Sequence, residues 1–262
     1  MSQSARAFAD GLLARGRHTF TGEEADSALG VSPNAAYLAL RRMVKHGRLG
    51  MPRRGFYLIL EPQHRALGAL PPANWIADLM RFHGAPYYVG LLSAAALHGA
   101  AHQQPQEFQV VTNAILRPVT VGRVRIRFFV RGAMRRAAIQ SMKTPSGPIE
   151  VSTPEMTAYD LVRYRHAASI DHVATVVAEL AEHMDAARLV AVARKNHEPP
   201  VVQRLGYLLE RTGHAALADA LARLPRKGRT RSVALEPGSP EPVAERSARW
   251  HILVNADVEV EA

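Results

Sequence analysis

The chain has 262 residues, which is long enough for two domains with ordinary hydrophobic cores. Its 33 Lys and Arg residues outnumber its 23 Asp and Glu residues, and this excess favours a polyanionic partner, a nucleic acid before a membrane surface. The absence of cysteine excludes disulfides and thiolate metal sites. We expect a soluble, cytoplasmic protein without a membrane partner, because no apolar run reaches membrane-spanning length and the first residues lack the apolar core of a signal peptide.

Two helices are predicted before residue 31. The apolar residues within 5–14 recur at the spacing of a helix with one buried stripe. Thr21 and Glu24 have the spacing of a capping box, in which each side chain accepts a hydrogen bond from the other residue's backbone N–H. Gly30 then favours the end of this second helix.

Residues 32–47 predict a complete helix with two chemically different faces. Ser32 suits the N-cap, Pro33 the first helical position, and Gly47 a left-handed end. At a helical period, one side carries the apolar residues Ala36, Ala39, Leu40, Met43 and Val44. The opposite side carries Asn34, Leu38, Arg41 and Lys45, with Tyr37 and Arg42 on the flanks. The first side is expected to pack, and the second is typical of a DNA-recognition helix.

A two-stranded hairpin is predicted over residues 48–60, with Arg53 and Arg54 at its tip. Helix, helix, recognition helix and hairpin together predict that residues 1–62 form a winged helix-turn-helix DNA-binding domain. A helix fits the major groove, where Asn and Arg make bidentate contacts to base edges, while Arg42 and Arg48 suit phosphates and the hairpin tip suits backbone or a minor groove. The predicted DNA-binding residues are Ser32, Asn34, Tyr37, Arg41, Arg42, Lys45, Arg48, Arg53 and Arg54. The alternative is a solvated polar helix face followed by an ordinary polar turn.

Residues 63–74 predict a linker, because Pro71 and Pro72, with Pro62 just before, remove backbone donors and restrain the preceding residues. Residues 75–262 predict a mixed α/β domain with strands first and helices after, so the fold class is α+β. Within it we expect helices at 75–82, 87–98 and 153–164, strands at 108–112, 124–130 and 149–152, and a helical region at 171–224 broken near 184–185, 198–200 and 213. Residues 225–246 predict a flexible or draped segment, and 250–255 and 258–260 a terminal strand.

Several short motifs, taken in order, resemble one family. They are Arg54-Gly55-Phe56-Tyr57, residues 88–99, Thr153-Pro154-Glu155 with Asp160-Leu161, residues 203–210 and residues 250–255. With them the whole chain resembles the AbiEi-type antitoxins of type IV toxin-antitoxin, or abortive-infection, systems. The resemblance implies a repressor that binds inverted repeats in the promoter of its own operon and counteracts a nucleotidyltransferase-type toxin. The alternative is an antitoxin that acts mainly by binding its toxin directly, with DNA binding secondary.

A second basic surface is predicted around the strand at 124–130. Its residues are Arg123, Arg125, Arg127 and Arg131, opposite Val124, Ile126, Phe128 and Val130, and then Arg135 and Arg136. This surface would extend the DNA footprint or meet an acidic surface of the toxin. The alternative is the wet face of a half-buried antiparallel strand, since strand alternation alone produces such a row.

The sequence supports no catalytic residue, metal or cofactor. His98 and His102 have a four-residue spacing, but the segment between them lacks the glutamate of a metalloprotease helix and contains Gly99. Nucleotidyl transfer requires paired carboxylates on a strand to hold magnesium, and residues 107–111 offer only Glu107. We therefore expect a protein that is not an enzyme.

Overall fold

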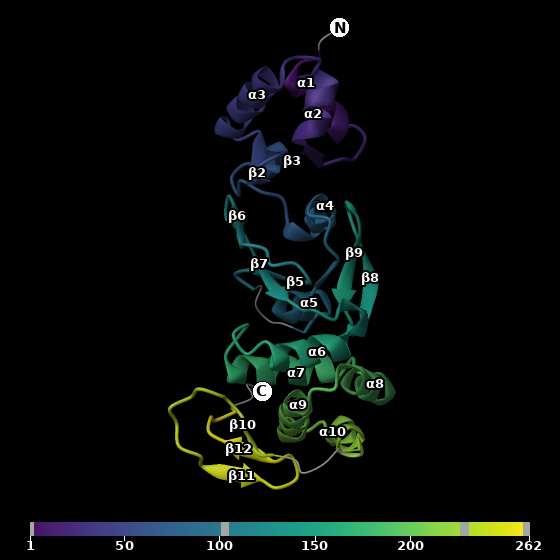
Figure 1. The fold of residues 1–262 in the computed structure, drawn as a ribbon, viewed down its shortest axis with the longest axis vertical. Helices are drawn as coiled ribbons and strands as arrows, with labels where there is room; N and C mark the ends of the chain where they lie inside the picture. The colour runs from purple at the N-terminus through teal and green to yellow at the C-terminus, as the bar shows by residue number, and fades with distance from the viewer. Residues whose placement is uncertain (1–2, 101–104, 226–230, 259–262) are drawn as a thin grey trace. The chain divides into compact units, whose positions relative to one another are not determined.

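The computed structural model describes residues 3–100, 105–225 and 231–258, and it has a mixed α+β fold (Figure 1). The α-helices are α1 (Ala5–Leu13), α2 (Gly22–Leu29), α3 (Pro33–Lys45), α4 (Ile76–Phe82), α5 (Leu91–Leu97), α6 (Pro154–Arg163), α7 (Ile170–Ala181), α8 (Ala186–Asn196), α9 (Pro199–Arg211) and α10 (Ala215–Ala222). Short 3-10 helices are η1 (Pro62–His64), η2 (Pro72–Asn74) and η3 (Met134–Arg136). Within the described ranges, no helix is long and apolar enough to cross a membrane.

The strands form three sheets. The first has the order β1 (Thr19–Thr21), β3 (Phe56–Ile59), β2 (Leu49–Arg53). The second has the order β6 (Val119–Val121), β7 (Val124–Val130), β5 (Phe108–Thr112), β4 (Tyr87–Val89), β9 (Gly147–Ser152), β8 (Ile139–Thr144). The third has the order β10 (Val233–Ala234), β12 (Ile252–Val254), β11 (Glu245–Ser247).

The chain forms two compact units, and each combines segments that are distant in sequence. Unit 1 contains Met1–Tyr88, Gln106–Gly132 and Ser141–Glu150. Unit 2 contains Val89–Pro105, Ala133–Gln140 and Val151–Ala262. This division does not follow the predicted linker at 63–74, because residues 1–62 share one compact unit with part of the six-stranded sheet.

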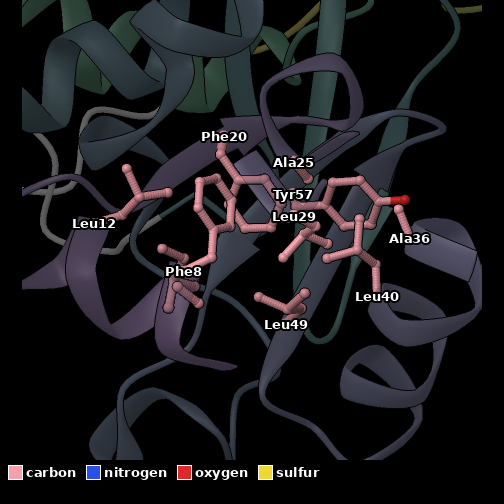
Figure 2. Packing of buried hydrophobic residues seen from close by; sticks show 11 residues of the cluster. Phe8, Leu12, Phe20, Ala25, Leu29, Ala36, Leu40, Leu49 and Tyr57 are labelled. Atoms are coloured by element: carbon pink, nitrogen blue, oxygen red, sulfur yellow. The ribbon is translucent and has the colours of Figure 1, made fainter. Parts of the chain in front are cut away.

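The first three helices follow their predicted positions, and an apolar core lies beneath them (Figure 2). Thr21 and Glu24 make both hydrogen bonds of the capping box, and Gly30 is left-handed at the end of α2. The ring of Phe20 packs edge-on against Phe8 and stacks on Tyr57, each at a centroid distance of 5.2 Å. Phe20 lies on β1, a strand that the sequence analysis missed because only Thr21 was assigned there, as a cap.

The segment predicted as a linker is packed into unit 1. Ala69 and Leu70 are buried, and the Trp75 indole Nε1 donates a hydrogen bond to the Leu70 carbonyl at 3.0 Å. The Arg123 backbone N–H donates to the Leu67 carbonyl at 2.8 Å, so this segment contacts the β6–β7 turn. Residues 63–74 therefore pack against the β6–β7 turn and the start of α4. The prolines in this segment are typical of a linker, but its buried side chains are not.

Two predictions for the large sheet are wrong. The helix predicted over 87–98 begins only at Leu91, because Tyr87–Val89 forms β4 and pairs in parallel with β9 through Val89 and Val151. The alternation predicted for β7 places Val124, Ile126, Phe128 and Val130 on one face. Of these only Ile126 is buried and Val130 is 46% exposed, whereas Phe129 and Arg131 of the other face are buried.

Unit 2 contains the predicted helical region. The three predicted breaks fall between α7, α8, α9 and α10, where Asp185 caps α8 and Pro199 begins α9. The predicted flexible or draped segment at 225–246 includes β10 and the start of β11, which pair with β12, and Leu235 in it is buried. Residues 226–230 and most of the strand predicted at 258–260 lie outside the described residues.

The first test concerns the contact between the 67–68 backbone and the β6–β7 turn. Gly122 has φ +54°, and a Cβ there would lie 2.1 Å from the Leu67 carbonyl oxygen and 2.7 Å from the Gly68 Cα. Gly122→Ala is expected to lower the free energy of unfolding by about 2–4 kcal/mol, from left-handed strain and overpacking. Gly84→Ala, with a similar φ and open space around it, should lose only about 1–2 kcal/mol in the same urea titration. Equal losses would contradict the close approach.

The second test concerns the packing of Trp250 on α9. A Cβ at Gly206 would lie 2.1 Å from the Trp250 ring, so Gly206→Ala should displace the indole and destabilise unit 2 by about 1–3 kcal/mol. Gly11, inside α1 and without a neighbour within 4 Å, is the matched control, and Gly11→Ala should stabilise by about 0.5–1 kcal/mol. Urea unfolding followed by tryptophan fluorescence checks both changes. A neutral Gly206→Ala would rule out this packing.

Candidate nucleic-acid interface

The ends of α3 are set by its own residues, as predicted. The Ser32 hydroxyl accepts a hydrogen bond from the Ala35 backbone N–H at 3.3 Å, and Pro33 occupies the first helical position. Gly47 has φ +64°, and the Arg48 N–H then donates to the Met43 carbonyl at 2.9 Å. Both ends of the helix are therefore specified by local sequence.

The two predicted faces of α3 are confirmed by burial. Ala36 and Leu40 are buried, and Met43 and Val44 pack against the same core. The exposed residues of the other side are Asn34, Tyr37, Leu38, Arg41, Arg42 and Lys45. The helix thus presents one continuous row of polar, cationic and apolar groups to solvent.

A groove of about 790 Å³ lies between α3 and the hairpin. Its lining residues are Tyr37, Leu38, Arg41, Arg42, Val44, Lys45, Met51 and Tyr57. Three of these carry a positive charge and none is acidic, so the groove favours an anion. Burial raises the pKa of the Tyr57 hydroxyl above its ordinary value, which keeps this group neutral at physiological pH.

The two arginines predicted at the hairpin tip have different environments. Arg53 is the last residue of β2 and pairs with Phe56, which leaves Arg54 and the left-handed Gly55 as the turn. The Arg53 guanidinium is half-buried and donates to the Arg117 backbone carbonyl, whereas Arg54 is exposed. Burial, and secondarily the charge of Arg117, lowers the pKa of Arg53. Arg54 is therefore the freer of the two to meet a ligand, while Arg53 is bonded to the protein itself.

The C-terminal end of α4 lies beside this hairpin. The Phe82 ring is 5.5 Å from Phe56 and packs near Gly55. The following residue, His83, has a half-buried ring, and burial together with the nearby Arg53 charge lowers its pKa. The hairpin tip is thus supported by residues from beyond position 62, which sequence reasoning did not connect with it.

The predicted second basic surface is not a single surface. Arg125 and Arg127 lie 3.6 and 3.9 Å from the Glu107 carboxylate, which offsets part of their charge. Arg131 is only 3% exposed and so is not available to an external partner. Arg123 is exposed in unit 1, and Arg135 and Arg136 are exposed on η3 in unit 2. Ion pairing distinguishes Arg125 and Arg127 from the other arginines, and burial distinguishes Arg131. Residue spacing reveals neither property.

The Thr153-Pro154-Glu155 motif in unit 2 has a structural explanation. Thr153 caps α6 by accepting from the Met156 N–H. The fully buried Glu155 accepts a hydrogen bond from the Asp185 N–H at 3.0 Å and forms an ion pair with the Arg188 Nε, also at 3.0 Å. The Glu155 carboxylate therefore joins the start of α6 to the start of α8. Sequence reasoning named this motif but gave Glu155 no partner.

Metal ligands do not gather in the described part of the chain. No three His, Asp or Glu side chains there are grouped as a metal site would require. The His98 Nε2 atom lies 2.7 Å from the Ser152 carbonyl oxygen, and His102 lies outside the described residues.

Two family models match the chain. Residues 12–59 match the transcriptional regulator, AbiEi antitoxin, and residues 88–211 match the AbiEi antitoxin C-terminal domain. The first match spans α2, α3 and the hairpin, and the second spans α5 to α9 and the motifs around Glu155 and Gly206. The chain therefore belongs to the AbiEi antitoxins, a class of transcriptional regulators in toxin-antitoxin systems.

One solved structure supports the fold. The crystal structure of the RV2827C protein from Mycobacterium tuberculosis is 17% identical and matches over 96% of this chain and 92% of its own, with a TM-score of 0.69. An antigenic nucleotidyltransferase-like protein from Paracoccidioides brasiliensis matches over 57% of this chain and 89% of its own at 10% identity, but its TM-score of 0.41 is too low to support a conclusion. No curated protein sequence matches the chain significantly.

A pH titration tests the environment of His83. Because its pKa is lowered in the folded protein, the unfolded chain binds this proton more readily, and stability should fall as the pH drops below about 6.5. In His83→Gln the fall between about pH 6.5 and 5 should be smaller. Urea unfolding at a series of pH values measures this, and identical slopes in the two proteins would contradict the lowered pKa.

Proposed function

We propose that this antitoxin represses its own toxin-antitoxin operon by binding inverted repeats in the promoter with residues 1–62, which act as a winged helix-turn-helix. The observation that carries the proposal is the exposed side of α3, together with a groove that three cations and no carboxylate line. A helix of this kind fits the major groove, and the hairpin after it has the position of a wing.

The predicted DNA-binding side chains suit different parts of the duplex, according to their length and their hydrogen-bonding groups. Asn34 and Arg41 suit base edges, because an amide or a guanidinium makes bidentate hydrogen bonds there. Ser32, Tyr37, Arg42, Lys45 and Arg48 suit the sugar-phosphate backbone on either side. Arg54 is the wing residue that reaches DNA, and Arg53 fixes the wing through its bond to the Arg117 carbonyl.

Arg123 extends this footprint in the same unit. Its backbone is bonded to Leu67, and its turn lies beside β2, because a Cβ at Gly50 would be 3.1 Å from the Val121 side chain. The β6–β7 turn is therefore a neighbour of the wing. One additional phosphate contact from Arg123 would fit this placement.

The antitoxin also counteracts a nucleotidyltransferase-type toxin in this proposal. Repression lowers toxin synthesis, and the family membership supports an antitoxin role. Direct binding of the toxin, with DNA binding secondary, is the competing mechanism. The two differ in salt dependence, since phosphate contacts make log affinity fall by about 0.9 per phosphate with log salt, and an apolar protein interface responds far less.

Footprinting and titration on the DNA upstream of the protein's own gene, at two salt concentrations, test the proposal. The unmutated protein should protect paired half-sites, and Arg41→Ala/Lys45→Ala should bind at least about tenfold more weakly, with a salt slope lower by about 1 because only Lys45 of the two is assigned to a phosphate. The matched control is Arg194→Ala/Lys195→Ala, which removes the same two charges from exposed positions of α8 and should bind as the unmutated protein does. No preference for this DNA over random duplex would overturn autoregulation.

A further inference from the structure

The exposed side of α3 carries apolar groups that phosphate binding does not explain. Tyr37 and Leu38 are 45% and 44% exposed, and Met51, across the groove, is 39% exposed. Single exposed apolar residues are common on protein surfaces, but these three line one groove together with three cations. The occupant of this groove must therefore offer both negative charge and an apolar group.

Leu38 has the central position among them. It lies one turn after Asn34 and one turn before Arg41 and Arg42, so its neighbours on the helix surface are about 5–6 Å away. The Arg42 Nε donates to the Leu38 carbonyl at 3.3 Å, which holds the start of that guanidinium group along the helix beside Leu38. The isobutyl group of Leu38 is thus framed by one amide and two cations.

A second copy of this chain is a poor occupant. The chain has a net charge of +10, and the same groove on another copy would bring Arg41, Arg42 and Lys45 against their equivalents. Duplex DNA offers phosphates at the rim and one apolar group in the major groove, the C5-methyl group of thymine. Duplex DNA therefore supplies both the negative charge and the apolar group that this groove would accommodate.

We propose that Leu38 determines operator specificity by packing on the C5-methyl group of a thymine in each half-site, an inference that rests on the proposed DNA-binding function. Asn34, one turn away, suits an adenine, whose N6 amino group donates to the amide oxygen while its N7 accepts from the amide NH2 group. Together they would select A·T pairs at the centre of the α3 footprint. Tyr37 and Met51 border the same methyl group and exclude water from it.

The test compares thymine with deoxyuridine, which lacks only the C5-methyl group. Upstream DNA is prepared with deoxyuridine at single thymine positions of the protected half-site, and affinity is measured for the unmutated protein and for Leu38→Ala. Loss of one buried methyl group corresponds to about a fourfold weaker affinity. The unmutated protein should show this loss at one position in each half-site, whereas Leu38→Ala should bind thymine DNA more weakly and be insensitive to deoxyuridine there.

Val243→Ala is the control, because Val243 is 45% exposed and lies in unit 2, outside the proposed footprint. This variant should keep both the affinity and the sensitivity to deoxyuridine. The proposal is overturned if the unmutated protein binds both DNAs equally, or if Leu38→Ala remains as sensitive to deoxyuridine as the unmutated protein. It is also overturned if Leu38→Ala changes self-association in sedimentation and leaves DNA affinity unchanged. Equal binding of operator and random duplex would instead mark failure of the proposed function itself.

Discussion

Burial of the apolar side of α3 is the constraint on which the candidate interface depends. Ala36 and Leu40 are almost completely removed from solvent against α1, α2 and the hairpin, and Phe8, Phe20 and Tyr57 fill the same core (Figure 2). Rotating the helix by one residue would expose these groups and bury charged ones, at a cost of several kcal/mol. The core thereby fixes which side chains of α3 face a ligand.

Unit 1 then supports the hairpin from outside the N-terminal segment. Leu67 and Gly68 contact the backbone at Gly122, Phe82 packs near the tip, and Arg53 bonds to Arg117. Such contacts reduce the conformational freedom of the hairpin, so less entropy would be lost if it ordered on a ligand. The N-terminal segment that carries the candidate interface is consequently one part of a larger compact unit.

Buried contacts in unit 2 join motifs that are distant in the sequence. Glu155 joins α6 to α8, and Gln203 and Gly206 on α9 receive Trp250 from the C-terminal strand region. These are buried contacts that hold helices in place. These motifs therefore have a packing role in unit 2.

The sequence by itself determined the first three helices, their ends and the two faces of α3. Caps such as Ser32 and Thr21 and the apolar period act within a few residues, so they can be read without knowledge of the fold. The tertiary structure alone decided β1, β4 and β8, because short strands acquire their hydrogen bonds from partners far along the chain. It also decided that Arg53 bonds to the Arg117 carbonyl, that Arg54 is exposed and that Arg131 is buried. These contacts depend on long-range packing, which the spacing of residues in the sequence does not encode.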